Sequence, residues 1–253
     1  MSKLSECLVR TIRVYCDLEC QLDRLLMILG YRRRFFSQKG QDRWLTKRVF
    51  PDRKKGYFVE VGAGNGISHS NTYILERDFD WNGVLIEANP HYAAEIRHTR
   101  KAVCVNACVD SKAGHTDFLY YGYMGGIVGD DTDNCMTKRP VMLQQNANNI
   151  MHVPTMKLDD VLAAAGAPLE IDYLSIDVEG AEHRVLDGLS FTKFTFSAIT
   201  IERPTPIIHK RLINAGFVLD RYRYCDGFYI SAALAQQLAI VPRSFAGARR
   251  KAF

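Results

Sequence analysis

The chain has 253 residues, 47% of them hydrophobic, which is enough to bury one substantial core. No apolar run approaches the ~20 residues that a membrane-spanning helix needs, and the first residues lack a signal-peptide pattern, so we expect a cytoplasmic protein without a transmembrane segment. The seven cysteines are an odd number without a C-x-x-C pair, which favours reduced thiols over a disulfide framework or a zinc site. The net charge of +5 arises at the two ends, residues 1–36 and 242–253, so we expect no nucleic-acid partner for the middle of the chain.

The first predicted element is a long helix over residues 2–30, bounded by Gly30. Its mostly apolar stripe alternates at spacings of four and three residues, as in the a/d repeat of a coiled coil. The stripe consists of Leu4, Leu8, Thr11, Tyr15, Leu18, Leu22, Leu25 and Leu29. It could pack on its own domain, pair with a second copy, or attach to a membrane surface with the help of Arg32–Arg34. We predict self-association, because an exposed stripe of this length must be covered by something.

A short helix over residues 37–50 leads into a strand at Tyr57–Val61, whose residues have high strand propensity. Gly62, Gly64 and Gly66 follow, and glycines let the backbone turn sharply and approach a ligand that a Cβ would exclude. A helix is expected next, from Ser68 to Arg77, with its free N–H groups facing that ligand.

Glu60, two residues before the first glycine, indicates the kind of ligand. A pyrophosphate-binding loop has little use for a carboxylate there, and its usual fingerprint is G-x-G-x-x-G. An acid suits a cationic, amine-bearing ligand, and S-adenosylmethionine (SAM) is one. Asn71 and Thr72 lie at the start of the next helix, where they could reach the methionine end of SAM or serve as helix caps.

Two further strand ends carry candidate ligand groups. The strand Gly83–Ile86 ends in Glu87, followed by Ala88 and Asn89, and a carboxylate at this place could hold a ribose diol. A third strand is predicted at Ala102–Cys108. Asp110 follows it after Val109, as a candidate acceptor for the adenine amino group or as a simple turn residue.

The rest of the chain alternates between strands and helices. Residues 121–152 are the exception, rich in Gly, Asp, Asn and Gln, and we interpret them as an irregular substrate-side loop. The expected strands are 115–120, 171–178, 196–201, 217–224 and 227–230, and the expected helices are 158–165, 181–186 and 207–215. Residues 242–253 are predicted to be a basic tail.

Six blocks, taken together, resemble the FkbM family of SAM-dependent methyltransferases. They are Ser37–Asp42, Phe58–Gly64, Ser70–Thr72, Ile86–Pro90, Leu158–Leu162 and Ile171–Glu182, in family order within residues 37 to 203. The resemblance implies an α/β, Rossmann-like class I sheet, mostly parallel with an antiparallel last strand and helices on both faces. It places the methyltransferase domain at 37–241, after an N-terminal helical extension at 1–36. Gln41 and Asp42 fall in a block that lies close to SAM in the family, although an ordinary helix N-terminus explains Asp42 almost as well.

The predicted catalytic residues end the fourth and fifth strands. Asp177 and Glu202 would lie on the ligand side of the sheet, as a general base or as ligands of a Mg²⁺ or Mn²⁺ ion that acidifies a hydroxyl. His183 is a second candidate base. Each also has a structural interpretation: Asp177 as a helix cap, Glu202 as a partner of Arg203, and His183 as a surface residue.

The resemblance implies methylation of a hydroxyl on a sugar, glycoside, surface polysaccharide or natural product. A nitrogen acceptor, or an inactive protein with a SAM fold, are the alternatives. The predicted SAM-binding residues are Gln41, Asp42, Glu60, Gly62, Ala63, Gly64, Gly66, Asn71, Thr72, Glu87, Ala88, Asn89, Cys108, Val109, Asp110 and Asp177.

Overall fold

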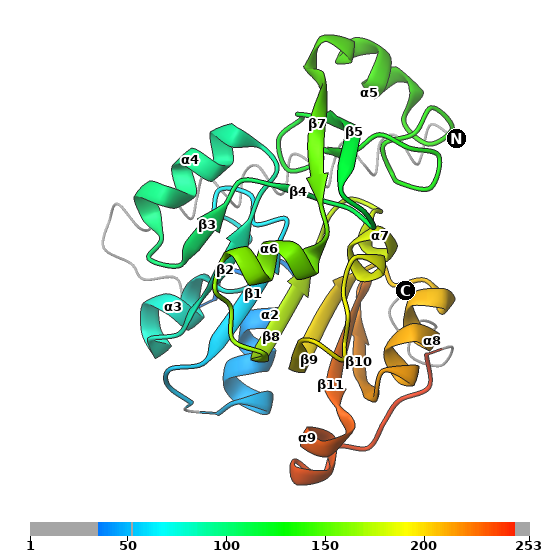
Figure 1. Ribbon diagram of the computed structural model, residues 1–253. Helices are drawn as coiled ribbons and strands as arrows, with labels where there is room; N and C mark the ends of the chain where they lie inside the picture. Colours follow the sequence, from blue (N-terminus) through cyan, green and yellow to red (C-terminus); the bar gives the residue numbers. More distant parts are fainter. Residues whose placement is uncertain (1–34, 52, 246–253) are drawn as a thin grey trace.

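The computed structural model describes residues 35–51 and 53–245, which form a mixed α/β fold with two sheets (Figure 1). The large sheet has seven strands in the order β10-β11-β9-β8-β1-β2-β3. Their bounds are β1 Tyr57–Val61, β2 Asn82–Ile86, β3 Val103–Val105, β8 Glu170–Ile176, β9 Thr195–Glu202, β10 Phe217–Arg223 and β11 Asp226–Ser231. The helix predicted over 2–30 and residues 246–253 of the predicted tail lie outside the described part of the chain.

Strand direction in the large sheet places several loops at one edge. β1 pairs in parallel with β2 and β8, β2 with β3, and β8 with β9. β11 runs antiparallel to both β9 and β10, so the expected antiparallel last strand is confirmed. Because parallel strands end at the same edge of a sheet, the loops after β1, β2, β8 and β9 come together there.

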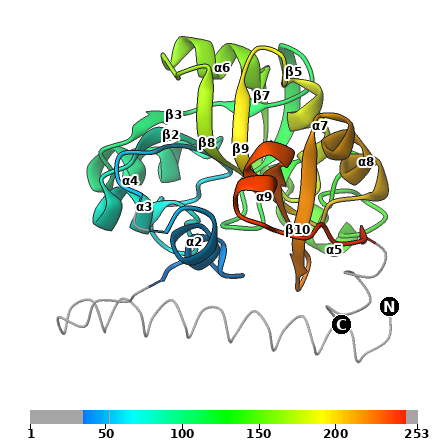
Figure 2. The ribbon, with the colours of Figure 1, turned by 90° about the horizontal axis from the view of Figure 1, so that it is seen from below.

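Helices cover both faces of the large sheet, as Figure 2 shows for α6 on one side and α2 and α9 on the other. Alternation along β1 explains this arrangement: Val59 and Val61 belong to one apolar cluster and Phe58 to another. The first cluster contains residues of α6 Leu158–Ala164, α7 Glu182–Asp187 and α8 Pro206–Asn214. The second contains residues of α2 Gln41–Trp44, the π-helix η1 Leu45–Val49, α3 Tyr73–Phe79, α4 Pro90–Thr99 and α9 Ala232–Gln237. No helix among the described residues is long and apolar enough to cross a membrane.

The small sheet corrects two predictions. It has the order β4-β7-β5-β6, with β4 Cys108–Val109, β5 Gly114–Leu119, β6 Gly126–Ile127 and β7 Ile150–Met156. The segment 121–152, predicted as one irregular loop, therefore contains β6, a helix α5 Pro140–Gln145, a short 3-10 turn η2 Ala147–Asn149 and the start of β7. The segment has regular structure because β7 pairs with β5 along six residues. This is a long-range contact that no local sequence pattern predicts.

The predicted third strand, Ala102–Cys108, is two strands in two sheets. β3 belongs to the large sheet, whereas β4 pairs with β7 in the small one. The break lies at Asn106, whose amide Nδ2 donates to the carbonyl oxygens of Glu87 at 2.8 Å and Ala88 at 3.1 Å. This contact with the end of β2 holds the chain where it leaves the large sheet.

The helix predicted from Ser68 to Arg77 begins later, at Tyr73. Asn65 Oδ1 accepts from the backbone N–H groups of Ile67 and Ser68, and this local turn competes with helix formation. The helix α4 was not anticipated from the sequence. Its start carries ordinary signals: Pro90 at the first helical position, and Asn89, whose side chain accepts from His91 N.

Candidate functional site

A cavity of about 770 Å³ opens at the carboxyl ends of the parallel strands. The loops after β1, β2 and β8 contribute to its wall, together with Glu202 at the end of β9, β4 and residues 118–127. Twelve of the predicted site residues line it: Glu60, Gly62, Ala63, Gly64, Asn71, Glu87, Ala88, Asn89, Cys108, Val109, Asp177 and Glu202. Most of the residues predicted as site residues therefore lie at this edge of the sheet and line the cavity.

The glycine loop after β1 is packed tightly against the end of β8. Gly62 has a φ of +83°, and a Cβ there would lie 1.8 Å from the carbonyl oxygen of Asp177. The backbone N–H groups of Gly62 and Ala63 both donate to the Ile86 carbonyl, at 3.0 and 3.2 Å. Any side chain at position 62 would push apart the two strand ends that carry the candidate acids.

Glu87 is fixed at the end of β2 with its carboxylate toward the cavity. Its Oε2 accepts from Gly64 N and its Oε1 from Asn89 N, both at 2.8 Å. A carboxylate has about four acceptor positions, so each oxygen retains capacity for a ligand. Burial raises the pKa of Glu87 to about 7, although these backbone N–H groups act in the opposite direction.

Glu60 is buried in the wall beneath the loop. Its Oε1 accepts from Asn71 N at 2.7 Å, and its Oε2 accepts from the hydroxyls of Ser70 at 2.9 Å and Thr72 at 2.5 Å. Burial raises the pKa of Glu60, while Arg100 and these three hydrogen bonds lower it. Three of its acceptor positions are thus already used to hold residues 70–72 in place.

A group of acids lies where β8 and β9 end. Carboxylate oxygens of Asp177, Glu179 and Glu202 all lie within 4.8 Å of one another. No hydrogen bond from a described residue reaches the Asp177 carboxylate, and burial together with Glu202 and Glu179 raises its pKa well above the usual range. The arrangement therefore favours an Asp177 that takes up a proton more readily than an exposed aspartate does.

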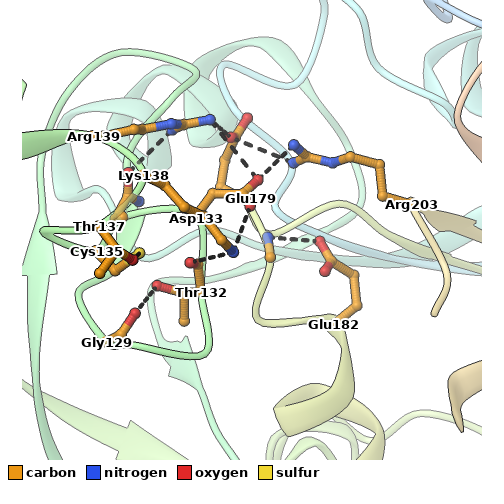
Figure 3. A network of polar contacts seen from close by, with 12 residues as sticks. Gly129, Thr132, Asp133, Cys135, Thr137, Lys138, Arg139, Glu179, Glu182 and Arg203 are labelled. Atoms are coloured by element: carbon orange, nitrogen blue, oxygen red, sulfur yellow. Dashed lines mark hydrogen bonds and ion pairs between the residues drawn. The ribbon is translucent and has the colours of Figure 1, made fainter. Parts of the chain in front are cut away.

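Two arginines form ion pairs with Glu179 and Glu202. Through Asp133 they also connect these acids to the segment 121–152, and Figure 3 shows the contacts around Glu179 and Asp133. Arg203 lies 2.5 Å from both Glu202 and Asp133, and Arg139 lies 3.0 Å from Glu179. Asp133 N also donates to the Glu179 carbonyl at 3.0 Å. Glu179 and Arg203 themselves adopt positive φ values, +55° and +44°, which are uncommon for residues with a side chain and typically cluster at functional sites.

The first part of the predicted substrate-side loop forms one wall of the cavity, from Tyr121 to Ile127. Tyr123 lies over the glycine loop and stacks on Tyr92 of α4, with ring centroids 5.3 Å apart. The ring of His69 also lies near Tyr123, with ring centroids 5.6 Å apart. The remainder of the predicted loop, from residue 128 to the start of β7, is absent from the cavity lining.

Six predicted site residues do not line the cavity. Gln41 donates to Asp226 at 2.6 Å, and Asp42 accepts from the Ser37 hydroxyl at 2.5 Å, so both are held inside the domain. His183 is 36% exposed and lies 2.7 Å from Asp131 outside the cavity, and this position favours its interpretation as a surface helix residue. The other three are Gly66, Thr72 and Asp110. Thr72 is bound to Glu60, and Asp110 is paired with Arg184 at 3.3 Å.

The cavity also contains residues that the sequence analysis missed. Tyr92 carries no sequence signal, because it is placed only by tertiary contacts, whereas Lys39 stands in the block Ser37–Asp42 but was not singled out. Ser70 and Glu179 could have been predicted, since they stand in the blocks Ser70–Thr72 and Ile171–Glu182. Their residue types alone did not distinguish them from helix-capping residues.

The family model described as the methyltransferase FkbM domain matches residues 60–218, which is more than half of the chain. No curated protein matches the chain. Among solved structures, a crystal structure of methyltransferase FkbM from Methylobacillus flagellatus KT is similar at 11% identity with a TM-score of 0.42. That similarity covers 71% of this chain and 44% of the other, so this chain spans less than half the length of that protein. On the family match, the protein belongs to the FkbM methyltransferase family.

Proposed function

We propose that the protein is a SAM-dependent methyltransferase that modifies a hydroxyl group of a sugar, glycoside, surface polysaccharide or natural product. The observation that carries this proposal is the pairing, in one cavity, of Glu87 with the acid pair Asp177 and Glu202. Glu87 is suited to accept hydrogen bonds from a ribose diol. Asp177 and Glu202 are suited to take the proton of the acceptor hydroxyl. The strand order, with its antiparallel β11, supports a Rossmann-like methyltransferase sheet.

The cavity residues fit SAM by their donor and acceptor chemistry. Glu87 has acceptor capacity left on both oxygens after its two backbone hydrogen bonds, which suits two vicinal hydroxyls. Glu60 and the Asn71 side chain would hold the amino-acid end, and Cys108 and Val109 would border the adenine. SAM, when bound, supplies an electrophilic methyl group on sulfur. The chain's contribution is chiefly alignment of donor and acceptor, which can supply ~7–11 kcal/mol of the barrier reduction.

Asp177 is the stronger candidate for the general base. A base works best with a pKa near the operating pH, and the burial and like charges around Asp177 raise its pKa in that direction. Glu202 forms an ion pair with Arg203 at 2.5 Å. Its proposed role is therefore to position the acceptor hydroxyl. A positioned base typically adds roughly 10²–10⁴-fold to the rate.

A divalent cation held by Asp177, Glu179 and Glu202 is a second way to acidify the hydroxyl, because their oxygens are close enough to share an ion. Arg139 and Arg203 compete with it, since they already neutralise Glu179 and Glu202. We therefore favour the base, and chelation distinguishes the two: EDTA should leave activity intact.

Methyl-labelled SAM and mass spectrometry would test the proposal against a panel of neutral glycans, glycolipids and amine-bearing analogues. The expected result is a one-methyl mass increase on a hydroxyl acceptor, strongly reduced in Asp177→Asn. Transfer only to amines would favour the nitrogen-acceptor alternative. SAM binding without transfer to any member of a broad panel would favour an inactive protein with a SAM fold.

A further inference from the structure

Arg100 is a buried arginine behind the cavity wall. It follows α4 directly, its side chain is 0% exposed, and its guanidinium lies 5.6 Å from the ring centre of Phe58 and 5.4 Å from that of Tyr73. A buried charge is costly unless it is paired and hydrogen-bonded, so its partners indicate what it does.

The partners of Arg100 are the two ends of the turn Gly66–Thr72. Nη1 donates to the Gly66 carbonyl at 2.6 Å and reaches the Ser70 hydroxyl at 3.4 Å. Nη2 donates to the Thr72 hydroxyl at 3.1 Å. On the far side, Nε lies 3.3 Å from Glu76 of α3. One guanidinium therefore fixes the shape of the turn that carries Ser70 and Asn71 into the cavity wall.

Glu60 binds the same two hydroxyls from the opposite side. Ser70 and Thr72 each have one hydroxyl hydrogen, and each donates it to Glu60 Oε2. The lone pairs of the Ser70 and Thr72 hydroxyl oxygens then accept the hydrogen bonds from Arg100. This fixed order, from Arg100 through a hydroxyl to the carboxylate, requires a positive Arg100 and a negative Glu60 to be fully satisfied.

We propose that Arg100 is a positioning residue for the cofactor: it holds the Gly66–Thr72 turn and keeps Glu60 in the orientation and charge state that receive the amino end of SAM. Arg100 itself does not line the cavity, so it acts through Glu60 and the turn. This inference rests on the proposed function, because it assumes that SAM is the ligand.

The surroundings of Glu60 explain why a charge is needed there. Burial raises the pKa of Glu60, and Arg100 is the charged group that most lowers it. Glu87 at the end of β2 and Tyr173 on β8 also face Glu60, and Glu76 faces Arg100 from α3. Each of these is acidic or neutral, so none can replace the positive charge. Without Arg100, the pKa of Glu60 should rise, and a protonated Glu60 would no longer attract a cation.

Calorimetric titration of the full chain with SAM, at about pH 6 and about pH 8, would test the proposal. The variants are Arg100→Gln, which removes the charge, and Arg100→Lys, which keeps it. Arg97→Gln is the matched control, since Arg97 is an exposed residue of the same helix. The quantity compared is the ratio of variant to wild-type Kd at each pH, because the ligand's own amino group titrates near pH 8 and cancels in that ratio.

For Arg100→Gln we expect a ratio of at least about tenfold at the lower pH and about threefold or less at the higher pH. Arg100→Lys should have a ratio that changes little with pH, and Arg97→Gln should bind as wild type. A ratio for Arg100→Gln that is independent of pH, or the same pH dependence in Arg100→Lys, would overturn the proposal in favour of a purely structural role.

Glu60→Gln keeps the test decisive if Arg100→Gln does not fold. It removes the titrating group while preserving the shape of the side chain, so it should weaken SAM binding at both pH values. Wild-type affinity in Glu60→Gln would overturn the proposal. A wild-type chain that does not bind SAM would overturn the proposed function and this inference together, whereas the outcomes above overturn the inference alone.

Discussion

Replacement of Glu87 is the most direct perturbation of the SAM assignment. The residue anchors the glycine loop through Gly64 N and the start of α4 through Asn89 N, and it retains acceptor capacity toward the cavity. Glu87→Ala removes all of these bonds. Glu87→Gln keeps one carbonyl oxygen and replaces the other with a donor, so it separates loss of the side chain from loss of its charge.

The expected magnitude follows from the hydrogen bonds that the side chain can make. A hydrogen bond to a charged group contributes about 1.5–3 kcal/mol, and Glu87 offers a diol at least one such bond beyond those it makes to the backbone. Loss of one bond predicts a fall in SAM affinity of about tenfold to about a hundredfold for Glu87→Ala. Glu87→Gln should fall between this variant and the wild type.

The pH dependence gives a second, independent signature. Because burial raises the pKa of Glu87 to about 7, the carboxyl is partly protonated at neutral pH in the ligand-free protein. A ribose diol donates its hydrogens, so it should bind the ionised form better, and affinity should increase as the pH rises through about 7. Glu87→Gln cannot titrate and should lose this dependence, and the two profiles should converge below the pKa.

Isothermal calorimetry with SAM measures both effects, with the melting temperature of each variant recorded as a check on folding. Glu95→Ala is the matched control, because Glu95 is an acid of the neighbouring helix α4 whose side chain is 38% exposed and forms an ion pair only with His91 among the described residues. Unchanged affinity in a folded Glu87→Ala would refute the ribose assignment. A Glu87→Gln variant with the wild-type pH profile would refute the argument from its pKa.

Four further predictions address the two candidate catalytic acids, a metal ion at those acids, the buried carboxyls and the N-terminal segment. Asp177→Asn and Glu202→Gln should each reduce turnover by about a hundredfold or more while SAM still binds, and full activity in both would contradict their proposed roles. Loss of activity with EDTA, restored by magnesium, would favour the metal over the base. The ligand-free protein should melt at a higher temperature at about pH 5.5 than at about pH 8, since three buried carboxyls have a pKa raised by burial to about 7, and the stability of such protonated groups is lost as the pH rises through that value. These carboxyls are Glu87, Glu182 and Asp226, and equal melting temperatures would show that their ionisation is offset elsewhere. Light scattering should find an oligomer for the full chain and a monomer for a chain that begins at Ser37; a monomeric full chain would contradict self-association through residues 2–30.

The position of the cavity along the large sheet follows from local patterns in the sequence. Glu60, the glycine loop, Glu87 and Asp177 all stand at the end of a strand or one residue beyond it. A short apolar run followed by a glycine or an acid is a local pattern, and parallel strands carry their ends to one edge whatever the details of packing. For this reason most of the predicted cavity residues are where they were expected.

Whether a polar side chain predicted for the site faces the cavity depends on its contacts in the folded protein. Asp110 and His183 have suitable residue types, but Arg184 and Asp131 hold them outside the cavity. Conversely, Arg100 supports the cavity wall through contacts with Gly66, Ser70 and Thr72, between 28 and 34 residues away along the chain.

The same distinction applies to the segment that begins at residue 121. Its composition predicted an irregular loop, yet strand pairing between β5 and β7 and the contacts of Asp133 with Arg203 and Glu179 give it a defined place. These contacts of Asp133 join residues 46 and 70 positions apart. They leave no periodicity in the sequence, because the partner of each charge is chosen by the packing of distant elements rather than by its neighbours along the chain.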